Sequence, residues 1–367
     1  MNILCLKTSL VKGINIITKA VASRSTTPIL ECCLLVAKNN NLTLKAYDLE
    51  IAIQTTPIEA DVLEEGSIAI EAKTLFDIVK RVPQEKLEII VDDKNLVTIK
   101  SGTSEFKILG YDGSEFPELP EITKDEPYKI PATQLKDMIK QTIFSISKDD
   151  TRPQLRGGLL EIKDNSLRLV CVDGFRISYR HFPFIHNSNA KTIIPEKTLK
   201  EISQILPDEN DNFVDIYISD RHILLETSEC IIISSLIEGE FLNYEGMFTR
   251  ESTTTITINK NPFIDCIERA TTISKDAKKN PIRLNIENGN IIVTSNTEIG
   301  SSYEEIEAEQ DGPALEIGFN PRYIIDALRV IEGDTVNMFF TTSLSPCIIQ
   351  EPEGQEFKYL VLPLRIR

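Results

Sequence analysis

The stretch "IEAKTLFDIVKRV" (70–82) has two relatives in the same chain, "IPEKTLKEISQIL" (194–206) and "FNPRYIIDALRVI" (319–331). Each one runs from an apolar residue through a turn-like pair to a basic residue, and then into apolar residues at three- and four-residue steps. This pattern predicts a strand end that leads into a short amphipathic helix. The recurring basic residues, Lys73, Lys197 and Arg322, are 124 and 125 positions apart. The interval predicts three copies of one large unit rather than a short solenoid repeat.

The sequence around these stretches repeats at the same interval. A second helical pattern precedes each copy, at 8–23, 132–147 and 261–274. Alternating apolar runs follow it, joined by the hairpin signals "KNNN", "KDNS" and "ENGN". Asp48 and Asp173 close the second run in the first two copies, and Phe116 and Phe241 follow later; each pair is 125 positions apart. We read the two aspartates as turn residues that close a strand.

The repeat predicts an α+β fold of three domains, each with two helices and about eight antiparallel strands. The acidic, proline-containing segment 120–128 and the Ser/Thr-rich segment 249–255 are the predicted boundaries. The three predicted domains are 1–120, 127–248 and 253–367.

Composition limits the function classes. The seven cysteines form no C-x-x-C pair and the three histidines lack zinc-motif spacing, so we expect buried free thiols, no metal site and no cofactor. We read no signal peptide and no apolar run of membrane-spanning length, and we therefore expect a cytoplasmic protein without a membrane partner.

Charge is segregated along the chain. The net charge is −16, yet residues 6–26 carry four basic side chains and no acidic one, and the six helical patterns together are net basic. One explanation is that lysine is a good helix former. The other is that the helices share a surface that meets a polyanion, through phosphate contacts that carry little sequence information.

The full chain resembles the bacterial sliding clamps, the beta subunits of DNA polymerase III. The resemblance rests on "RSTTPIL" (24–30), "GGLLEIKDNSLRLVCVDGFRIS" (157–178), "IGFNPRYIIDAL" (317–328) and "YLVLPLR" (359–365). It implies a head-to-tail dimeric ring of six domains that encircles double-stranded DNA, independent of sequence, and acts as a processivity factor. It also implies partners that dock by clamp-binding peptides, namely the clamp loader, the alpha subunit of the replicative polymerase and other proteins.

The resemblance implies DNA contacts at Arg24 and Lys73, and at Lys148 and Arg152. The last two lie in "KDDTRPQ" (148–154), where Pro153 and Gln154 stand at positions that are aromatic in some clamps, and where Asp149 and Asp150 are adjacent.

The resemblance also implies a peptide pocket. Its expected residues are Leu155, Val172, Gly174, Phe175, Arg176, Ile177, Leu242, Met247, Asn320, Tyr323, Leu344, Pro346, Leu360, Val361, Leu362, Pro363 and Leu364. Alternate residues of the last strand should be core, whereas Pro363 interrupts that strand and leaves Leu362 and Leu364 to line a groove. Leu242, Gly246 and the final Arg367 depart from the usual clamp pattern.

The ring joint is expected at the strand "SEFKILG" (104–110), through Phe106 and Ile108. Thr272 and Ile273 of a second copy would lie opposite. Phe106 could instead belong to the interior of its own domain. The sequence shows no nucleophile–base constellation, so we expect a non-catalytic protein. A specialised clamp paralogue or a protein-only ring scaffold is the alternative.

Overall fold

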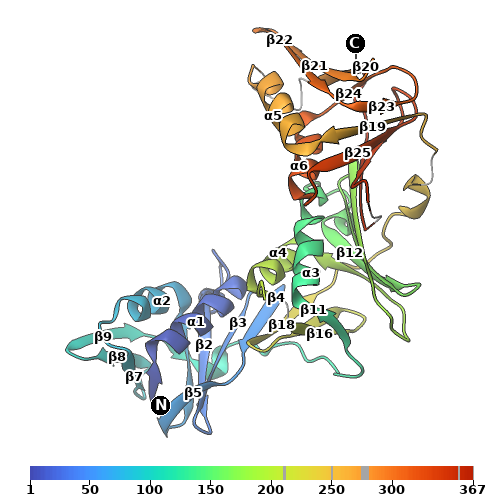
Figure 1. Ribbon diagram of the computed structural model, residues 1–367. Helices are drawn as coiled ribbons and strands as arrows, with labels where there is room; N and C mark the ends of the chain where they lie inside the picture. The colour runs from blue at the N-terminus through green and yellow to red at the C-terminus, as the bar shows by residue number, and fades with distance from the viewer. Residues whose placement is uncertain (210–211, 249–250, 274–280, 354–355, 367) are drawn as a thin grey trace. The chain divides into compact units, whose positions relative to one another are not determined.

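The computed structural model describes residues 1–209, 212–248, 251–273, 281–353 and 356–366 (Figure 1). It confirms a helix at each of the six predicted places. The helices are α1 Lys7–Ile17, α2 Ala72–Arg81, α3 Ala132–Lys140, α4 Glu196–Ile205, α5 Lys260–Thr271 and α6 Pro321–Val330.

The predicted helix 132–147 is too long. Helix α3 ends at Lys140, and a 3-10 turn covers Ile143–Ser145. Thr142 has left the helical region with φ −128°, and its hydroxyl donates to the Met138 carbonyl at 2.7 Å. The β-branched pair at 142–143 therefore stops the helix although the apolar spacing continues. Helix α1 likewise gives way to a 3-10 turn at Thr18–Ala20, and residue 274 of the third pattern lies outside the described residues.

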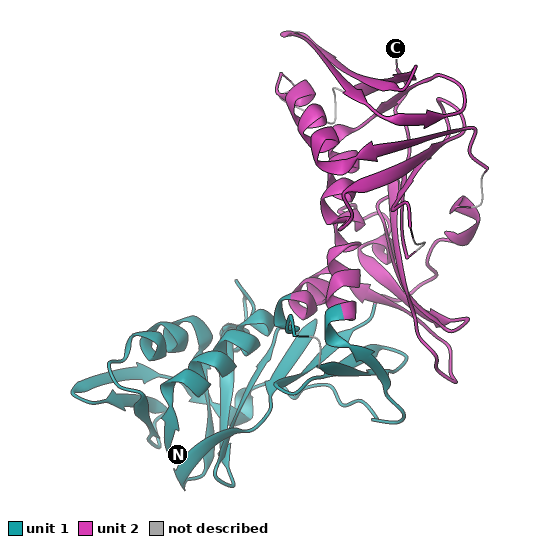
Figure 2. Ribbon diagram, in the orientation of Figure 1, with its two compact units in different colours: residues 1–133, 204–236 teal, residues 134–203, 237–367 magenta. Residues whose placement is uncertain are grey.

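The chain packs as two compact units, 1–133 with 204–236 and 134–203 with 237–367 (Figure 2). The strands of the first unit are β1 Asn2–Leu6, β2 Cys32–Lys38, β3 Asn41–Tyr47, β4 Ile51–Thr55, β5 Ile58–Glu64, β6 Gly66–Glu71, β7 Lys86–Val91, β8 Leu96–Ser101, β9 Ser104–Leu109, β10 Tyr111–Asp112, β11 Tyr128–Pro131, β16 Phe213–Ile218, β17 His222–Glu226 and β18 Cys230–Ser235. Those of the second are β12 Gly157–Lys163, β13 Ser166–Val172, β14 Arg176–Pro183, β15 Ala190–Pro195, β19 Thr254–Asn259, β20 Ile282–Glu287, β21 Asn290–Thr297, β22 Gly300–Glu307, β23 Glu309–Asp311, β24 Leu315–Phe319, β25 Thr335–Phe340, β26 Cys347–Gln350 and β27 Phe357–Val361.

Antiparallel pairing joins strands from different copies of the repeat. In the first unit the sheet runs β11-β16-β17-β18-β4-β3-β5-β1-β7-β8-β9, so β18 of the second copy pairs with β4 of the first. In the second unit one sheet runs β15-β12-β13-β14-β27-β26-β25-β19-β23 and another runs β22-β21-β20-β24. The division into compact units follows these continuous sheets, and so it cuts through the second copy.

The predicted hairpin turns are confirmed. Asn39 and Asn40 have φ values of 52° and 55°, and Asp164 and Asn165 have 53° and 55°. Two consecutive positive φ angles are typical of the tight turns that match the twist of antiparallel strands. The Asp48 and Asp173 assignment is also confirmed, because each carboxylate accepts backbone N–H groups two and three residues later.

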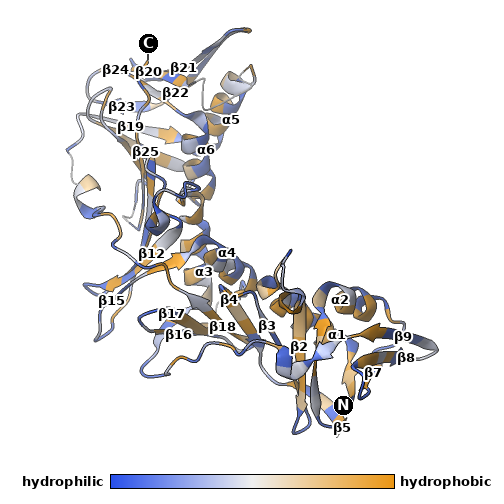
Figure 3. Cartoon of the chain, turned by 180° about the vertical axis from the view of Figure 1, so that it is seen from behind, coloured by the Kyte–Doolittle hydropathy of each residue, from blue (hydrophilic) through white to orange (hydrophobic). Residues whose placement is uncertain are grey.

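Apolar side chains fill the interior of each unit. Helix α1 buries Leu10, Ile14 and Ile17 completely, and helix α5 buries Phe263 and Ile267. Figure 3 shows hydrophobic colour along parts of several strands and helices, and hydrophilic colour on many loops. All seven cysteines are buried free thiols, as expected, and burial raises the pKa of Cys5 to about 12. In the described parts of the chain, no helix is long and apolar enough to cross a membrane, and no three His, Cys, Asp or Glu side chains group as metal ligands.

Candidate functional site

Four of the predicted pocket residues pack together inside the second unit. Leu155, Val172, Ile177 and Leu360 belong to a single buried apolar cluster. Ile177 and Leu360 are directly paired across strands β14 and β27. These four residues therefore lie in the core of the second unit and not at its surface.

Arg176 is the most constrained polar residue of the predicted set. Its guanidinium donates to Asp173 and to Asp326, each at 2.7 Å, and to the Phe144 carbonyl. The guanidinium carbon of Arg176 lies 4.5 Å from the ring centre of Tyr323. Burial alone would lower the pKa of Arg176, but the Tyr359 hydroxyl, Asp326 and Asp173 outweigh burial and raise it. Arg176 is thus a fixed cation that positions the loop before β14.

The exposed part of this loop presents an aromatic pair. Phe175 is 54% exposed and stacks on Tyr323 at a ring-centre distance of 6.3 Å. Gly174 has φ +90°, a conformation that favours glycine, and this turns Phe175 outward. Tyr323 is set by the start of helix α6, where the Asn320 side chain accepts the Arg322 N–H at 3.1 Å.

The chain terminus lies beside this pair. The Leu362 N–H donates to the Phe175 carbonyl at 2.9 Å, and the Leu364 N–H donates to the Gly318 carbonyl at 2.8 Å. Leu362 is 39% exposed, whereas Val361 is fully buried in the core beneath. Strand β27 ends at Val361, so the prediction that Pro363 interrupts the strand is confirmed, and Val361 is placed behind the wall rather than on it.

The other predicted pocket residues are at the surface. Leu344 and Leu364 line one hollow of about 790 Å³, together with the ion pair of Arg283 and Glu316. Pro346 and Pro363 are half-buried, and Leu242 and Met247 are exposed. Sequence reasoning missed Asp326 and Phe144, which hold Arg176 in place; they lie far from it in the chain, and no local pattern marks them.

We expect Arg176→Ala to destabilise the second unit by about 3–5 kcal/mol, because two partly buried carboxylates would lose their cation. That corresponds to a fall of ~10 °C in the thermal midpoint for a unit of this size. Differential scanning calorimetry would measure it. Arg322→Ala is the matched control, since Arg322 is exposed and lies 3.9 Å from Asp326. Equal midpoints for the two variants would contradict the role given to Arg176.

In the first unit, Arg24 and Lys73 are both exposed. Arg24 lies between two 3-10 turns, and Lys73 lies in the first turn of helix α2. Among the described residues no hydrogen bond or ion pair connects either side chain to the protein. Both cations are therefore open to an external anion.

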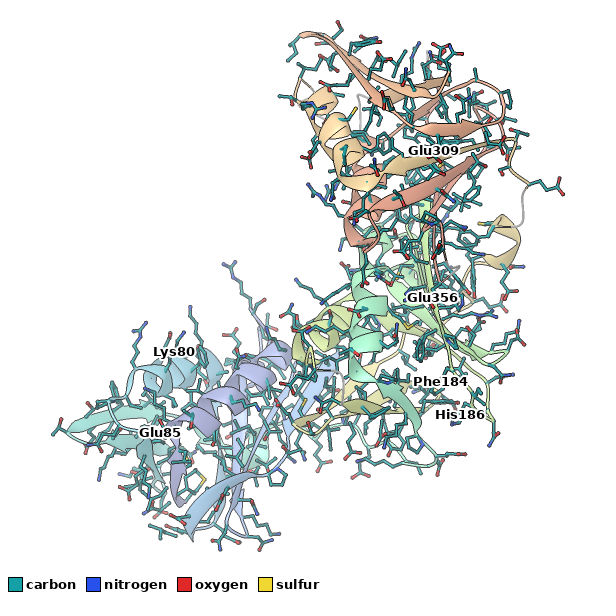
Figure 4. The ribbon with its side chains drawn as sticks, viewed as in Figure 1. Lys80, Glu85, Phe184, His186, Glu309 and Glu356 are labelled. Carbon is teal, nitrogen blue, oxygen red and sulfur yellow. The ribbon has the colours of Figure 1, made fainter. Side chains whose placement is uncertain are left out.

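Three other lysines in or next to helix α1 already have hydrogen-bond or ion-pair partners within the protein. Lys7 donates to the Val82 carbonyl at 2.8 Å, Lys12 pairs with Glu229 at 2.6 Å, and Lys19 donates to Gln204 at 2.6 Å. The N-terminus of α1 is also occupied, because Glu85 accepts the Thr8 hydroxyl at 2.5 Å and the Thr8 N–H at 3.0 Å, and these two bonds lower the pKa of Glu85. Figure 4 shows Lys80 on helix α2 and Glu85 in the segment that follows it. The net basic count of the helices thus overstates the charge available to phosphates.

In the second unit, Lys148 and Arg152 are exposed in the segment before β12. Lys148 forms an ion pair with Glu196, which reduces its availability. Asp149 is turned into its own loop, where it accepts the Thr151 N–H at 2.9 Å and the Thr151 hydroxyl at 2.8 Å; these bonds lower its pKa. Arg152 is the less engaged of the two predicted cations.

Several described strands lie at an open edge of their sheet, and two of them bear on the predicted joint. Strand β9 lies at one end of the sheet of the first unit, and β22 lies at one end of the four-stranded sheet of the second. Phe106 on β9 is 37% exposed, Ile108 is half-buried, and Leu109 beside them is 73% exposed. Thr272 and Ile273 follow helix α5, whose neighbour is β22. Sequence reasoning missed β22 with its exposed Tyr303, since an alternating polar strand gives no sign that its edge is free.

Comparison with known proteins gives full-length matches. Models of the DNA polymerase III beta subunit match along the chain, the N-terminal domain at residues 1–120, the central domain at 129–243 and the C-terminal domain at 246–365. The beta sliding clamp of Halalkalibacterium halodurans is 34% identical over 369 residues, which cover 97% of both chains. The crystal structure of the DNA polymerase sliding clamp from Bacillus subtilis matches with a TM-score of 0.96 at 31% identity, over 100% of both chains. The DNA polymerase III subunit beta from Pseudomonas aeruginosa matches with a TM-score of 0.95 at 28% identity, also over 100% of both chains.

Proposed function

Because the chain belongs to the family of DNA polymerase III beta subunits, the bacterial sliding clamps, we propose that two copies close head-to-tail into a ring around duplex DNA. The protein is a non-catalytic processivity factor of DNA replication, and its partners include the clamp loader and the replicative polymerase. The observation that carries the proposal is the succession of three clamp-domain matches along nearly the whole chain. We place the domains at 1–120, 127–248 and 253–367 and the protein in the cytoplasm.

The open sheet edges support the ring joint. A head-to-tail contact needs two different surfaces on each copy, and it closes into a ring when the rotation closes. Strand β9 offers apolar Phe106, Ile108 and Leu109, while β22 offers Tyr303 beside acidic residues. Pairing β9 of one copy with β22 of the other would satisfy both edges. Thr272 and Ile273 would border this joint.

Topological enclosure accounts for the acidic balance of the chain. A ring holds DNA without a tight grip, so a net charge of −16 does not oppose the function. Arg24, Lys73, Lys148 and Arg152 would make loose, sequence-independent contacts with phosphates, and such contacts permit sliding.

The groove beside the chain terminus would receive partner peptides. Phe175, Tyr323, Leu362 and Leu364 present apolar surface around the fixed Arg176, over a buried layer that keeps its shape. An extended partner segment with Gln and Leu or Phe side chains fits such a surface, because backbone groups give affinity and side-chain pockets give specificity. Leu242 and Met247, both exposed, would border the groove.

Loading onto circular DNA tests the ring. The protein is incubated with its cognate clamp loader, ATP and a nicked plasmid, and free protein is removed by gel filtration. The ring should stay with the circle and leave after a restriction enzyme linearises the plasmid. Retention on linear DNA would contradict topological binding, and failure to load with partner binding intact would favour a protein-only scaffold.

We expect Arg24→Ala with Lys73→Ala to weaken binding to a short primed duplex by about tenfold at low salt. Two phosphate contacts are lost, so the slope of log affinity against log salt should become shallower by about 2. Fluorescence anisotropy over a salt series measures both quantities. Lys38→Ala with Lys94→Ala, two exposed lysines at hairpin turns, is the control. An unchanged slope in the Arg24 and Lys73 variant would exclude these residues as phosphate contacts.

A further inference from the structure

The internal repeat builds the same three-stranded surface twice, once in each unit. We call this surface the floor. Asp48 accepts the Glu50 and Ile51 N–H groups at 3.0 and 2.9 Å, as Asp173 accepts those of the residues two and three later. The Glu50 carbonyl accepts the Ser235 N–H at 3.0 Å, just as the Phe175 carbonyl accepts the Leu362 N–H. Strands β3, β4 and β18 of the first unit therefore correspond to β13, β14 and β27 of the second.

A connecting segment crosses each floor. In the first unit it is anchored by Phe116, which is buried with Cys32 and Leu34. In the second it is anchored by Phe241, which is buried with Leu155 and Leu159. The anchors are 125 positions apart, so later residues of the two segments can be matched by the same interval.

In the second unit, aromatic side chains fill the space between the floor and the connecting segment that Phe241 anchors. Tyr179 on β14 lies 5.8 Å from the ring centre of Tyr244 and 5.8 Å from that of Phe248. The Tyr244 hydroxyl donates to Glu161 at 2.8 Å and closes the arrangement. We call these three rings the aromatic plug.

The first unit lacks this plug. The positions 125 residues earlier hold Gln54, Leu119 and Thr123, none of which is aromatic. A hollow of about 800 Å³ is left between the connecting segment and the sheet. Its walls include Leu34, Lys45, Gln54, Phe116, Leu119 and Ile233, which we call the first groove.

We propose that the first groove binds an extended segment of a partner protein that inserts an aromatic side chain and carries lysine or arginine beside it. The matched space in the second unit is filled by aromatic rings, which sets the size and shape of the side chain that fits. This site is separate from the peptide groove at the chain terminus, and its residues belong to the other compact unit.

The floor favours a peptide in this position. Lys45 and Gln54 are neighbours across β3 and β4, and both line the hollow. Their N–H donors can bind the carbonyl groups of an extended backbone. The Lys45 ammonium can also lie over an inserted ring, as a cation–π contact.

The exposed rim of the first groove, which we call the lip, favours a partner segment with positive charge. Glu118 and Glu121 are exposed and line the hollow, and no cation pairs with either of them among the described residues. The nearby Glu226 is already paired with Lys124 at 2.6 Å. An acidic lip repels nucleic acid and attracts a segment with basic residues.

Fluorescence anisotropy with short labelled peptides tests the proposal. The probes are a panel with one Phe, Tyr or Trp and two lysines at varied spacing, and a matched panel has Ala in place of the aromatic residue. We expect saturable binding by at least one aromatic probe and a loss of tenfold or more for its Ala counterpart. Gln54→Tyr with Leu119→Tyr rebuilds the plug and should weaken that probe at least tenfold.

A second pair of variants keeps the test valid if the plugged variant folds poorly. Glu118→Lys with Glu121→Lys changes only the exposed lip and should also weaken the probe at least tenfold. Asp125→Lys with Glu126→Lys alters the same connecting segment outside the groove and should leave binding unchanged. All variants should still bind a Gln-Leu-x-Leu-Phe peptide, so failure here is distinct from failure of the terminal groove.

Several results would overturn the proposal. These are no saturable binding by any probe at millimolar concentration, equal binding by the plugged variant, and an equal loss in the Asp125 and Glu126 control. Sedimentation of the plugged variant gives a further check. A changed oligomeric mass would assign the groove to contact between copies of the chain instead.

Discussion

A chain that ends at Val361 is expected to lose at least a hundredfold in affinity for a fluorescent peptide with a Gln-Leu-x-Leu-Phe segment. The truncation removes the exposed Leu362, which is bonded to the Phe175 carbonyl, and the half-buried Leu364, which is bonded to the Gly318 carbonyl. Each apolar side chain buried by the peptide contributes about 1.5–3 kcal/mol, and a hundredfold loss corresponds to about 2.7 kcal/mol. Fluorescence anisotropy measures the loss directly.

The fold should survive this truncation. Strand β27 ends at Val361 and stays paired with both β14 and β26, so the sheet keeps its full set of strands. The hydrogen bonds from Leu362 to Phe175 and from Leu364 to Gly318 are lost, but both lie beyond the end of strand β27. A chain that ends at Ile366 is the control and should bind as the intact chain does. If the chain that ends at Val361 binds the peptide equally well, the terminal groove is not the partner site.

The sequence was sufficient to predict the repeated architecture. Helix positions followed from apolar spacing, and hairpins followed from Asn, Asp and Gly turns that need positive φ angles. The end of α3 was not predictable from spacing, because the backbone leaves the helical region at Thr142 while the apolar pattern continues.

The candidate site was predictable only in part. The loop that carries Phe175 and Arg176 resembles a known motif, and the structure brings it next to the terminus and helix α6. The ion pair of Arg176 with Asp326 spans 150 positions, and nothing local signals such a partner. Lys12 likewise forms an ion pair with the distant Glu229, and Lys260 donates to the distant Ile331 carbonyl. A count of charges along the chain therefore could not reveal which cations are free.

The second large effect is expected at the ring joint. Phe106→Ala with Ile108→Ala should convert the dimer to monomer at micromolar concentration, while each unit stays folded. Truncating two apolar residues at the centre of an interface costs about 2–4 kcal/mol, and a ring contains this joint twice. The dissociation constant of the dimer should therefore rise ~1000-fold or more. Sedimentation velocity measures it, and Leu49→Ala with Leu63→Ala, two exposed apolar residues elsewhere in the first unit, should leave the dimer intact.

A complementary variant decides whether the joint is head-to-tail. Ile273→Ala with Tyr303→Ala alters the surface at β22 and should also give monomers, although β9 is untouched. When the β9 and β22 variants are mixed, a mixed dimer has one joint made of two unaltered surfaces and one joint altered on both sides. Mixing should therefore partly restore a dimer that neither variant forms alone. A β22 variant that stays dimeric would contradict the assignment of the β22 surface to the joint.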